Sequence, residues 1–263
     1  MHLFCVAILV ALVALADIAV AADDRWQVLR TSLFGDRAIE IAAPERLQLH
    51  TPLRAADGAL VPIAIRSLEM QTEHRYIAKL YLIIDRNPSP LGAVFQLTPA
   101  SGRADIETLV RIEEYTPVRV IAEYNDGGLI EATSFVKASG GCSAPASRDA
   151  AAALANLGRM RIKLDEDVGT DLALAQLMVS HPNHSGLAMD QITRLYQPPH
   201  FVRRLVVTYR DRPVLSAEMD FSISENPSFR FFFSRGGGGE LRAEVVDSEN
   251  LQFSTSVGIS GDR

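Results

Sequence analysis

"LVPIAIRSL", residues 60–68, sets a pattern that recurs through the first half of the chain. Its apolar side chains at Val61, Ile63 and Ile65 alternate with other residues, and this period of two is typical of a half-buried β-strand. Five runs of the same kind follow: "YIAKLYLIID", "GAVFQLTP", "DIETLVRIE", "PVRVIAEY" and "LIEATSFVKA". Turn residues separate them, and "NDGG" at residues 125–128 favours a hairpin. Residues 37–138 therefore predict an antiparallel β-sandwich.

A second series of strand-like runs occupies residues 159–257: "MRIKL", "LALAQLMVS", "FVRRLVVTYR", "PVLSAEMDFSIS", "SFRFFFSR" and "ELRAEVVD". They are again short and bounded by turn residues, so we expect a second β-sandwich. The glycine run "RGGGGE", residues 235–240, is expected to close a hairpin between the last two runs. A phosphate-binding loop would need a helix after the glycines, and a strand-like run follows instead.

Residues 139–158, "SGGCSAPASRDAAAALANLG", separate the two series and lack their apolar periodicity. Gly, Ala, Ser and Pro dominate this stretch, as they do in flexible linkers. Cys142 comes directly after Gly140 and Gly141, which have no side chains to shield a thiol and let the backbone bend freely. We therefore expect an exposed thiol on a flexible connection between two all-β domains.

The first 21 residues form a long apolar run that ends in "AVA", which is typical of a secretory signal peptide cleaved after Ala21 or Ala22. A membrane anchor is the alternative, but Asp17 interrupts the apolar run. Cleavage would remove Cys5 and leave Cys142 as the single cysteine. An exported protein with one cysteine cannot form an internal disulfide, so Cys142 is a candidate reactive thiol.

Charge and motifs exclude several classes of function. The 263-residue chain has a formal net charge of −6, whereas nucleic-acid binding favours clustered positive charge. We find no Ser-His-Asp, phosphate-loop or paired-cysteine motif, and one cysteine cannot serve a dithiol oxidoreductase. These observations favour a protein that is not an enzyme.

Three histidines lie near one another in the second half, His181 and His184 in "HPNHSG" and His200 in "QPPHF". A zinc site is the functional interpretation of this cluster. No further ligand at a familiar spacing completes it, and Pro182 indicates a loop. We therefore expect a loop that shapes the surface, with no metal ion and no cofactor.

The chain resembles the carrier proteins of bacterial sulfur oxidation, SoxY and SoxZ, fused in one polypeptide. The SoxY-like part covers residues 39–142, where "YLIIDRNPSPLGAVFQLTP" and "VKASGGC" carry the resemblance. The SoxZ-like part covers residues 159–257, where "SHPNHSGL", "QPPHFV", "SAEMDFSISENPSF" and "VVD" carry it. The chain looks most similar to the fused subgroup associated with quinoprotein dehydrogenases.

The resemblance implies a periplasmic location and two immunoglobulin-like β-sandwiches packed on each other through an apolar face. It also implies that Cys142 carries a sulfur intermediate, derived from thiosulfate or related to it, covalently to partner enzymes. Gly140 and Gly141 would give the carrier arm its flexibility. The family's arm ends the chain with glycines after the cysteine, whereas here Ser143 and Pro145 follow and a second domain comes after them.

A second interpretation is an adaptor or binding module for a periplasmic quinoprotein dehydrogenase, without covalent cargo. Neither interpretation involves nucleic acid, or a membrane once the signal peptide is removed.

Overall fold

The computed structural model describes residues 25–144, 155–165, 172–189 and 194–260. The chain divides into two compact units, residues 1–38 and residues 39–263. Residues 25–34 of the first unit are helical. The predicted signal peptide lies outside the described residues. Within the ranges above, no helix combines the length and the apolar character that a membrane span requires.

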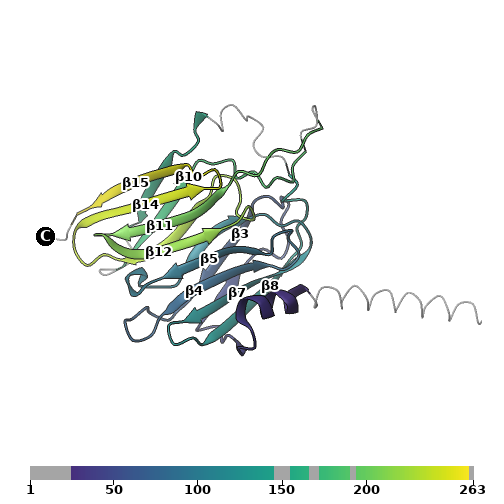
Figure 1. Cartoon of the computed structure of the whole chain (residues 1–263). Coiled ribbons are helices and arrows are strands. Elements are labelled where there is room, and N and C mark those ends of the chain that lie inside the picture. The colour runs from purple at the N-terminus through teal and green to yellow at the C-terminus, as the bar shows by residue number, and fades with distance from the viewer. Residues whose placement is uncertain (1–24, 145–154, 166–171, 190–193, 261–263) are drawn as a thin grey trace, which may run out of the picture. The chain divides into compact units, whose positions relative to one another are not determined.

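The second unit is built from two β-sheets that lie one behind the other (Figure 1). The larger sheet has nine described strands in the order β1 (Ile39–Ile41), β8 (Leu129–Val136), β7 (Thr116–Tyr124), β4 (Ile77–Ile84), β5 (Leu91–Leu97), β12 (Arg212–Met219), β11 (Val202–Tyr209), β14 (Gly239–Asp247) and β15 (Gln252–Ile259). The smaller has six described strands in the order β2 (Gln48–His50), β3 (Val61–Arg66), β6 (Ile106–Val110), β13 (Ser228–Ser234), β10 (Leu172–Val179) and β9 (Met160–Asp165). A short 3₁₀ helix, η1, spans Pro99–Ser101.

Neighbouring strands are antiparallel, apart from the parallel pair β1 and β8. The prediction of an all-β protein with two sandwich domains is therefore confirmed. We did not predict the short strands β1 and β2, nor β15, whose sequence "QFSTSVGI" is rich in small and polar residues.

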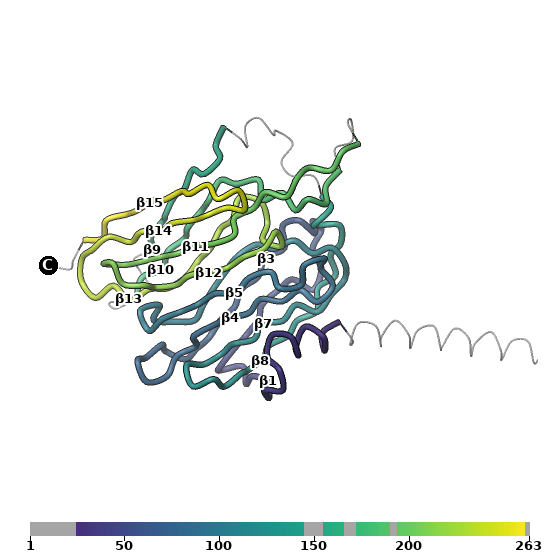
Figure 2. Tube along the Cα trace, in the orientation of Figure 1, coloured from purple at the N-terminus to yellow at the C-terminus, as the bar shows by residue number. Residues whose placement is uncertain are grey.

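Both sheets run across the boundary between the two halves of the chain. In the larger sheet β5 lies beside β12 and pairs with it (Figure 2). In the smaller sheet β6 pairs with β13. The halves therefore join edge to edge by backbone hydrogen bonds, an arrangement that we did not predict, in addition to the expected apolar contact between them. This arrangement also covers strand edges that would otherwise be exposed.

The core lies between the sheets and belongs to both halves. Val61, Ile63 and Ile65 are at most 2% exposed, as their alternation predicts. The ring centroids of Phe95 in β5 and Phe229 in β13 lie 6.2 Å apart in an edge-to-face arrangement. A single cluster of buried apolar side chains thus joins the SoxY-like and SoxZ-like parts.

The two glycine-rich turns have different roles. The predicted "NDGG" hairpin is confirmed, because it joins the antiparallel strands β7 and β8 with Gly127 at φ 87°. The predicted "RGGGGE" hairpin is wrong. It leads from β13 in the smaller sheet to β14 in the larger one, and Gly236 and Gly237 have positive φ angles of 48° and 95°. The glycines therefore carry the chain from one sheet to the other.

We propose that residues 139–158 separate two domains that fold as one cooperative unit. Cleavage at a protease site inserted after Ser147 should give two fragments that copurify and unfold in a single thermal transition. The reason is that the β5–β12 and β6–β13 pairs and the common core hold the fragments together. Two separate transitions, or fragments that elute apart on gel filtration, would contradict this proposal.

Candidate functional site: the Cys142 segment

The segment that leads to Cys142 is fixed by backbone hydrogen bonds. Gly140 donates its N–H to the carbonyl of Glu113 at 2.9 Å, and Gly141 donates to the carbonyl of Ile112 at 2.9 Å. On the other side of this contact, Ile112 donates its N–H to the carbonyl of Gly58 at 2.7 Å. The segment is therefore docked along the backbone that follows β6.

Cys142 is a free cysteine, and its side chain is 0% exposed. The expectation of an exposed thiol is therefore wrong. Local composition suggested exposure because small residues surround the cysteine in sequence. Residues distant in sequence contact this segment in space: Gly58 lies against Gly141, and Ser185 lies against the backbone of Cys142.

Glu113 and Ser185 hold the cysteine in place, and we call this pair the thiol latch. The carboxylate of Glu113 accepts hydrogen bonds from the N–H of Cys142 at 2.8 Å and from the N–H of Ser143 at 3.1 Å. It also accepts one from the Ser143 hydroxyl at 2.9 Å. The Ser185 hydroxyl donates to the carbonyl of Cys142. The latch thus joins the SoxY-like part to the SoxZ-like part at the cysteine.

Gly140 and Gly141 meet different constraints. A Cβ atom at position 141 would lie 2.0 Å from the Gly58 carbonyl oxygen and 2.8 Å from the Ile112 nitrogen, so only glycine fits. A Cβ atom at position 140 would meet open space, but Gly140 has a φ of +73°, which favours glycine. Both glycines therefore allow the segment to dock. Their role in the flexibility of an arm stays a prediction.

The environment of Cys142 keeps the thiol protonated. Burial raises the pKa of Cys142 to about 12, and the negative charges of Glu113 and Asp220 add to this effect. Arg111 acts in the opposite direction. Because the thiolate is the nucleophile, we expect the docked cysteine to react slowly at neutral pH.

Arg111 lies beside this segment and is only 2% exposed. Its guanidinium donates to the carbonyl oxygens of Asn183 at 3.0 Å and of Gly141 at 3.4 Å, and it lies 3.5 Å from that of Pro182. Its Nε atom is buried and has no hydrogen-bond partner among the described residues. Burial lowers the pKa of Arg111.

Two of the three predicted histidines meet in the structure. His200 Nε2 lies 2.7 Å from Asp247 Oδ2, and His181 Nε2 lies 3.6 Å from the same oxygen. All three side chains are buried, and their nearest polar atoms lie within 4.8 Å of one another. His184 is not part of this group. The group therefore provides three atoms of the kinds that bind metal ions.

Hydrogen bonding assigns the proton positions in this group. The N–H of Asn183 donates to His181 Nδ1 at 3.0 Å, so the neutral ring carries its own proton on Nε2, which faces Asp247. A protonated Nε2 has no lone pair for a metal ion. We therefore describe the group as a hydrogen-bonded network that fixes the loop of Asn183 and Ser185, and the absence of a metal stays a prediction.

This network should make the protein sensitive to mild acid. Burial lowers the pKa of His181 to about 4, whereas an unfolded histidine titrates near 6.5. Between these values the unfolded chain binds a proton that the folded chain does not, so stability falls as the pH falls. We expect the free energy of unfolding in urea to drop by about 2–3 kcal/mol more in the wild type than in His181→Gln between pH 7 and pH 4.5.

The matched control for this prediction is His74→Gln, which replaces an exposed histidine and should show the wild-type drop. An equal drop in the wild type and His181→Gln would show that His181 does not titrate in this window.

Comparison with protein families gives two matches. Residues 30–142 match the model for sulfur oxidation protein SoxY, and residues 162–258 match the model for sulphur oxidation protein SoxZ. The chain belongs to the SoxY and SoxZ sulfur-oxidation families, fused in one polypeptide. The SoxY match ends on Cys142, the residue that the thiol latch holds. A search of curated proteins found no match.

Solved structures show weaker likenesses. The sulfur carrier protein SoxY from Chlorobium limicola f thiosulfatophilum is 20% identical, with a TM-score of 0.37, over 44% of this chain and 93% of that chain. A superoxide reductase (neelaredoxin) from Ignicoccus hospitalis is 16% identical, with a TM-score of 0.31, over 36% of this chain and 80% of that chain. At these sequence identities and TM-scores, the similarities give no information about function.

The residues that surround Cys142 were not predicted as site residues. Ser185 falls within a stretch that carries the family resemblance, as does Asp247 of the histidine group, so those stretches were a usable signal. Arg111 and Glu113 follow β6 directly, and nothing in their local sequence distinguishes them from ordinary charged residues after a strand.

Proposed function

We propose that the protein is a periplasmic carrier that holds a sulfur intermediate, derived from thiosulfate or related to it, covalently on Cys142 and presents it to partner enzymes. The observation that supports this most is the position of the cysteine. It ends the SoxY match, follows two glycines and is held by the latch between the SoxY-like and SoxZ-like parts.

The latch suggests how such a carrier would alternate between two states. In the docked state the thiol is buried and protonated. Release of the contacts to Glu113 and Ser185 would expose the thiol and return its pKa toward the ordinary value of about 8.5. The exposed thiolate could then react in the active site of a partner enzyme. The protected state would limit side reactions of an unloaded thiol between visits.

Loading with thiosulfate would need a partner with an electron acceptor. Joining the Cys142 thiol to the outer sulfur of thiosulfate forms one S–S bond and releases one proton and two electrons. The carrier contributes the thiol and its presentation, and a periplasmic enzyme of sulfur oxidation would remove the electrons. We therefore propose that the protein is not itself an enzyme.

The adaptor for a quinoprotein dehydrogenase is the second candidate. The burial of Cys142 and its raised pKa favour it, because a thiol that stays docked carries no cargo. In an adaptor the cysteine would serve only to pack the junction between the two parts of the chain.

Substitution of Cys142 separates these two candidates. In the organism that makes the protein, Cys142→Ser should abolish growth or turnover that depends on the carrier. The buried hydroxyl costs stability, on the order of 1–3 kcal/mol if it finds no partner, so Cys142→Ala serves as a second variant. Both variants should accumulate as folded protein. Full function of either variant would rule out the carrier and support the adaptor.

A further inference from the structure

We propose that the buried guanidinium of Arg111 binds the negative charge of the cargo on Cys142. The cargo class is a sulfur anion bonded to Sγ, such as an S-thiosulfonate or a persulfide anion. This inference rests on the proposed carrier function. It assigns a binding role to a residue that neither the sequence pattern nor the family match had singled out.

Arg111 has no ion pair with a carboxylate among the described residues. Burial of a cation is costly unless an anion pairs with it. Arg111 is 2% exposed, and among the described residues its hydrogen bonds go only to carbonyl oxygens, those of Gly141 and Asn183 being the shortest. Its Nε–H is buried without a partner. Within the described ranges, the guanidinium therefore has an unused N–H donor and no ion pair with a carboxylate, although Glu225 and Asp57 act on it at longer range.

Arg111 also lies next to the segment that holds the thiol. Arg111 donates to the carbonyl of Gly141, the residue directly before the cysteine. A negative charge on Cys142 would raise the pKa of Arg111 more than the charges of Glu225 and Asp57 do. Nδ1 of His184 is buried without a hydrogen-bond partner among the described residues, and its ring also interacts with Arg111. The unsatisfied groups therefore lie close to the carrier thiol.

Loading would change the charge at Cys142. Unloaded Cys142 is neutral at pH 7 because its pKa is about 12, so it cannot neutralise Arg111. An S-thiosulfonate keeps its negative charge at any physiological pH. Arg111 therefore faces a neutral group in the unloaded protein and an anion in the loaded one. The guanidinium would favour anionic cargo over neutral adducts.

The test compares an anionic and a neutral adduct of similar size on purified protein. With tetrathionate, the Cys142 thiolate attacks a central sulfur, forms an S-thiosulfonate and displaces thiosulfate. With bis(2-hydroxyethyl) disulfide, the same thiolate forms a neutral mixed disulfide and displaces 2-mercaptoethanol. In the wild type, the melting temperature of the anionic adduct should be about 5 °C above that of the neutral adduct.

Variants assign this difference to the guanidinium. Arg111→Met should abolish it, and Arg111→Lys should restore part of it. Arg119→Met is the matched control, because Arg119 is also largely buried but pairs with Asp85 and Glu131, and it should keep the wild-type difference. Equal melting temperatures of the two adducts in the wild type would overturn the proposal, even if Arg111→Met does not fold. An unchanged difference in Arg111→Met would overturn it too.

These outcomes do not depend on the natural cargo, because both adducts are made in vitro. Failure of the carrier function would instead appear in the organism, as full activity of Cys142→Ser.

Discussion

Gly141→Ala is expected to release the Cys142 segment and to raise the rate of its alkylation by iodoacetamide about a thousandfold at pH 7. The added Cβ would lie 2.0 Å from the Gly58 carbonyl oxygen. The atoms around it belong to the backbone, so a small side-chain movement cannot relieve the clash. A released thiol loses the burial that raises its pKa to about 12, and a fall to about 8.5 gives roughly a thousand times more thiolate.

Gly140→Ala is the matched control for Gly141→Ala. Its Cβ would meet no atom within 4 Å, and the cost is the strain of a φ of +73°, about 1–2 kcal/mol. Its alkylation rate should rise by no more than about thirtyfold. Mass spectrometry of timed, quenched samples measures both rates, and circular dichroism checks that both variants are folded. A wild-type alkylation rate in folded Gly141→Ala would contradict the docked position of the segment.

Glu113→Ala is expected to open the thiol latch and to raise the alkylation rate about a hundredfold. The carboxylate accepts two backbone N–H bonds and one hydroxyl bond from Cys142 and Ser143, and bonds to a charged group contribute about 1.5–3 kcal/mol each. Water that solvates the freed N–H and O–H groups offsets part of this free energy. The substitution therefore favours the opened segment by about 3 kcal/mol. Removal of the negative charge also lowers the pKa of the thiol.

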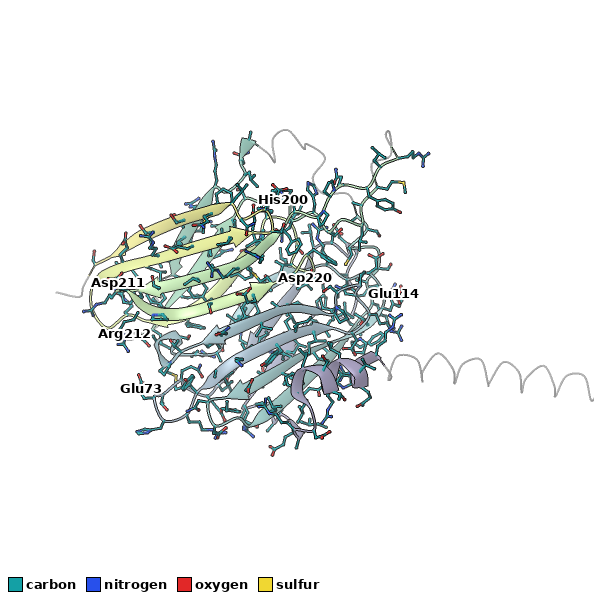
Figure 3. All side chains as sticks on the ribbon, in the orientation of Figure 1. Glu73, Glu114, His200, Asp211, Arg212 and Asp220 are labelled. Atoms are coloured by element: carbon teal, nitrogen blue, oxygen red, sulfur yellow. The ribbon has the colours of Figure 1, made fainter. Side chains whose placement is uncertain are left out.

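The neighbouring residue provides the control for Glu113. Glu114 is exposed and lies at the opposite end of the sheets from the turn at Asp211 (Figure 3). Glu114→Ala removes the same charge without touching the latch, so it should react at nearly the wild-type rate. Equal rates for the Glu113 and Glu114 variants would show that the latch does not control access to the thiol.

Most of the strands were predictable because their information is local. The alternation at Val61, Ile63 and Ile65 indicates a pleated strand with one buried face. The residues "NDGG" indicate a turn that needs a positive φ angle. The "RGGGGE" prediction failed because a run of glycines permits many turns. Pairing with distant strands decides which sheet each flanking strand joins, as the pairing of β13 with β10 and β6 shows.

The candidate site was only half predictable. Cys142 was evident as a cysteine after two glycines, but its burial depends on residues far away in sequence. Ser185 lies 43 residues further on and belongs to the other half of the chain. Arg111 would be expected on the solvent face, out of phase with Ile106 and Val110, and it is buried because the loop of Asn183 covers it. Composition around a residue cannot report such long-range contacts.

The central claim is that Cys142 carries covalent cargo, and mass spectrometry of the protein from its native organism tests it most directly. The protein should be purified without reductant from cells that oxidise sulfur compounds, and its intact mass measured before and after reduction. We predict added mass that reduction removes, that maps to the peptide containing Cys142, and that Cys142→Ser lacks. Wild-type protein that carries only the free thiol under these conditions would contradict the carrier.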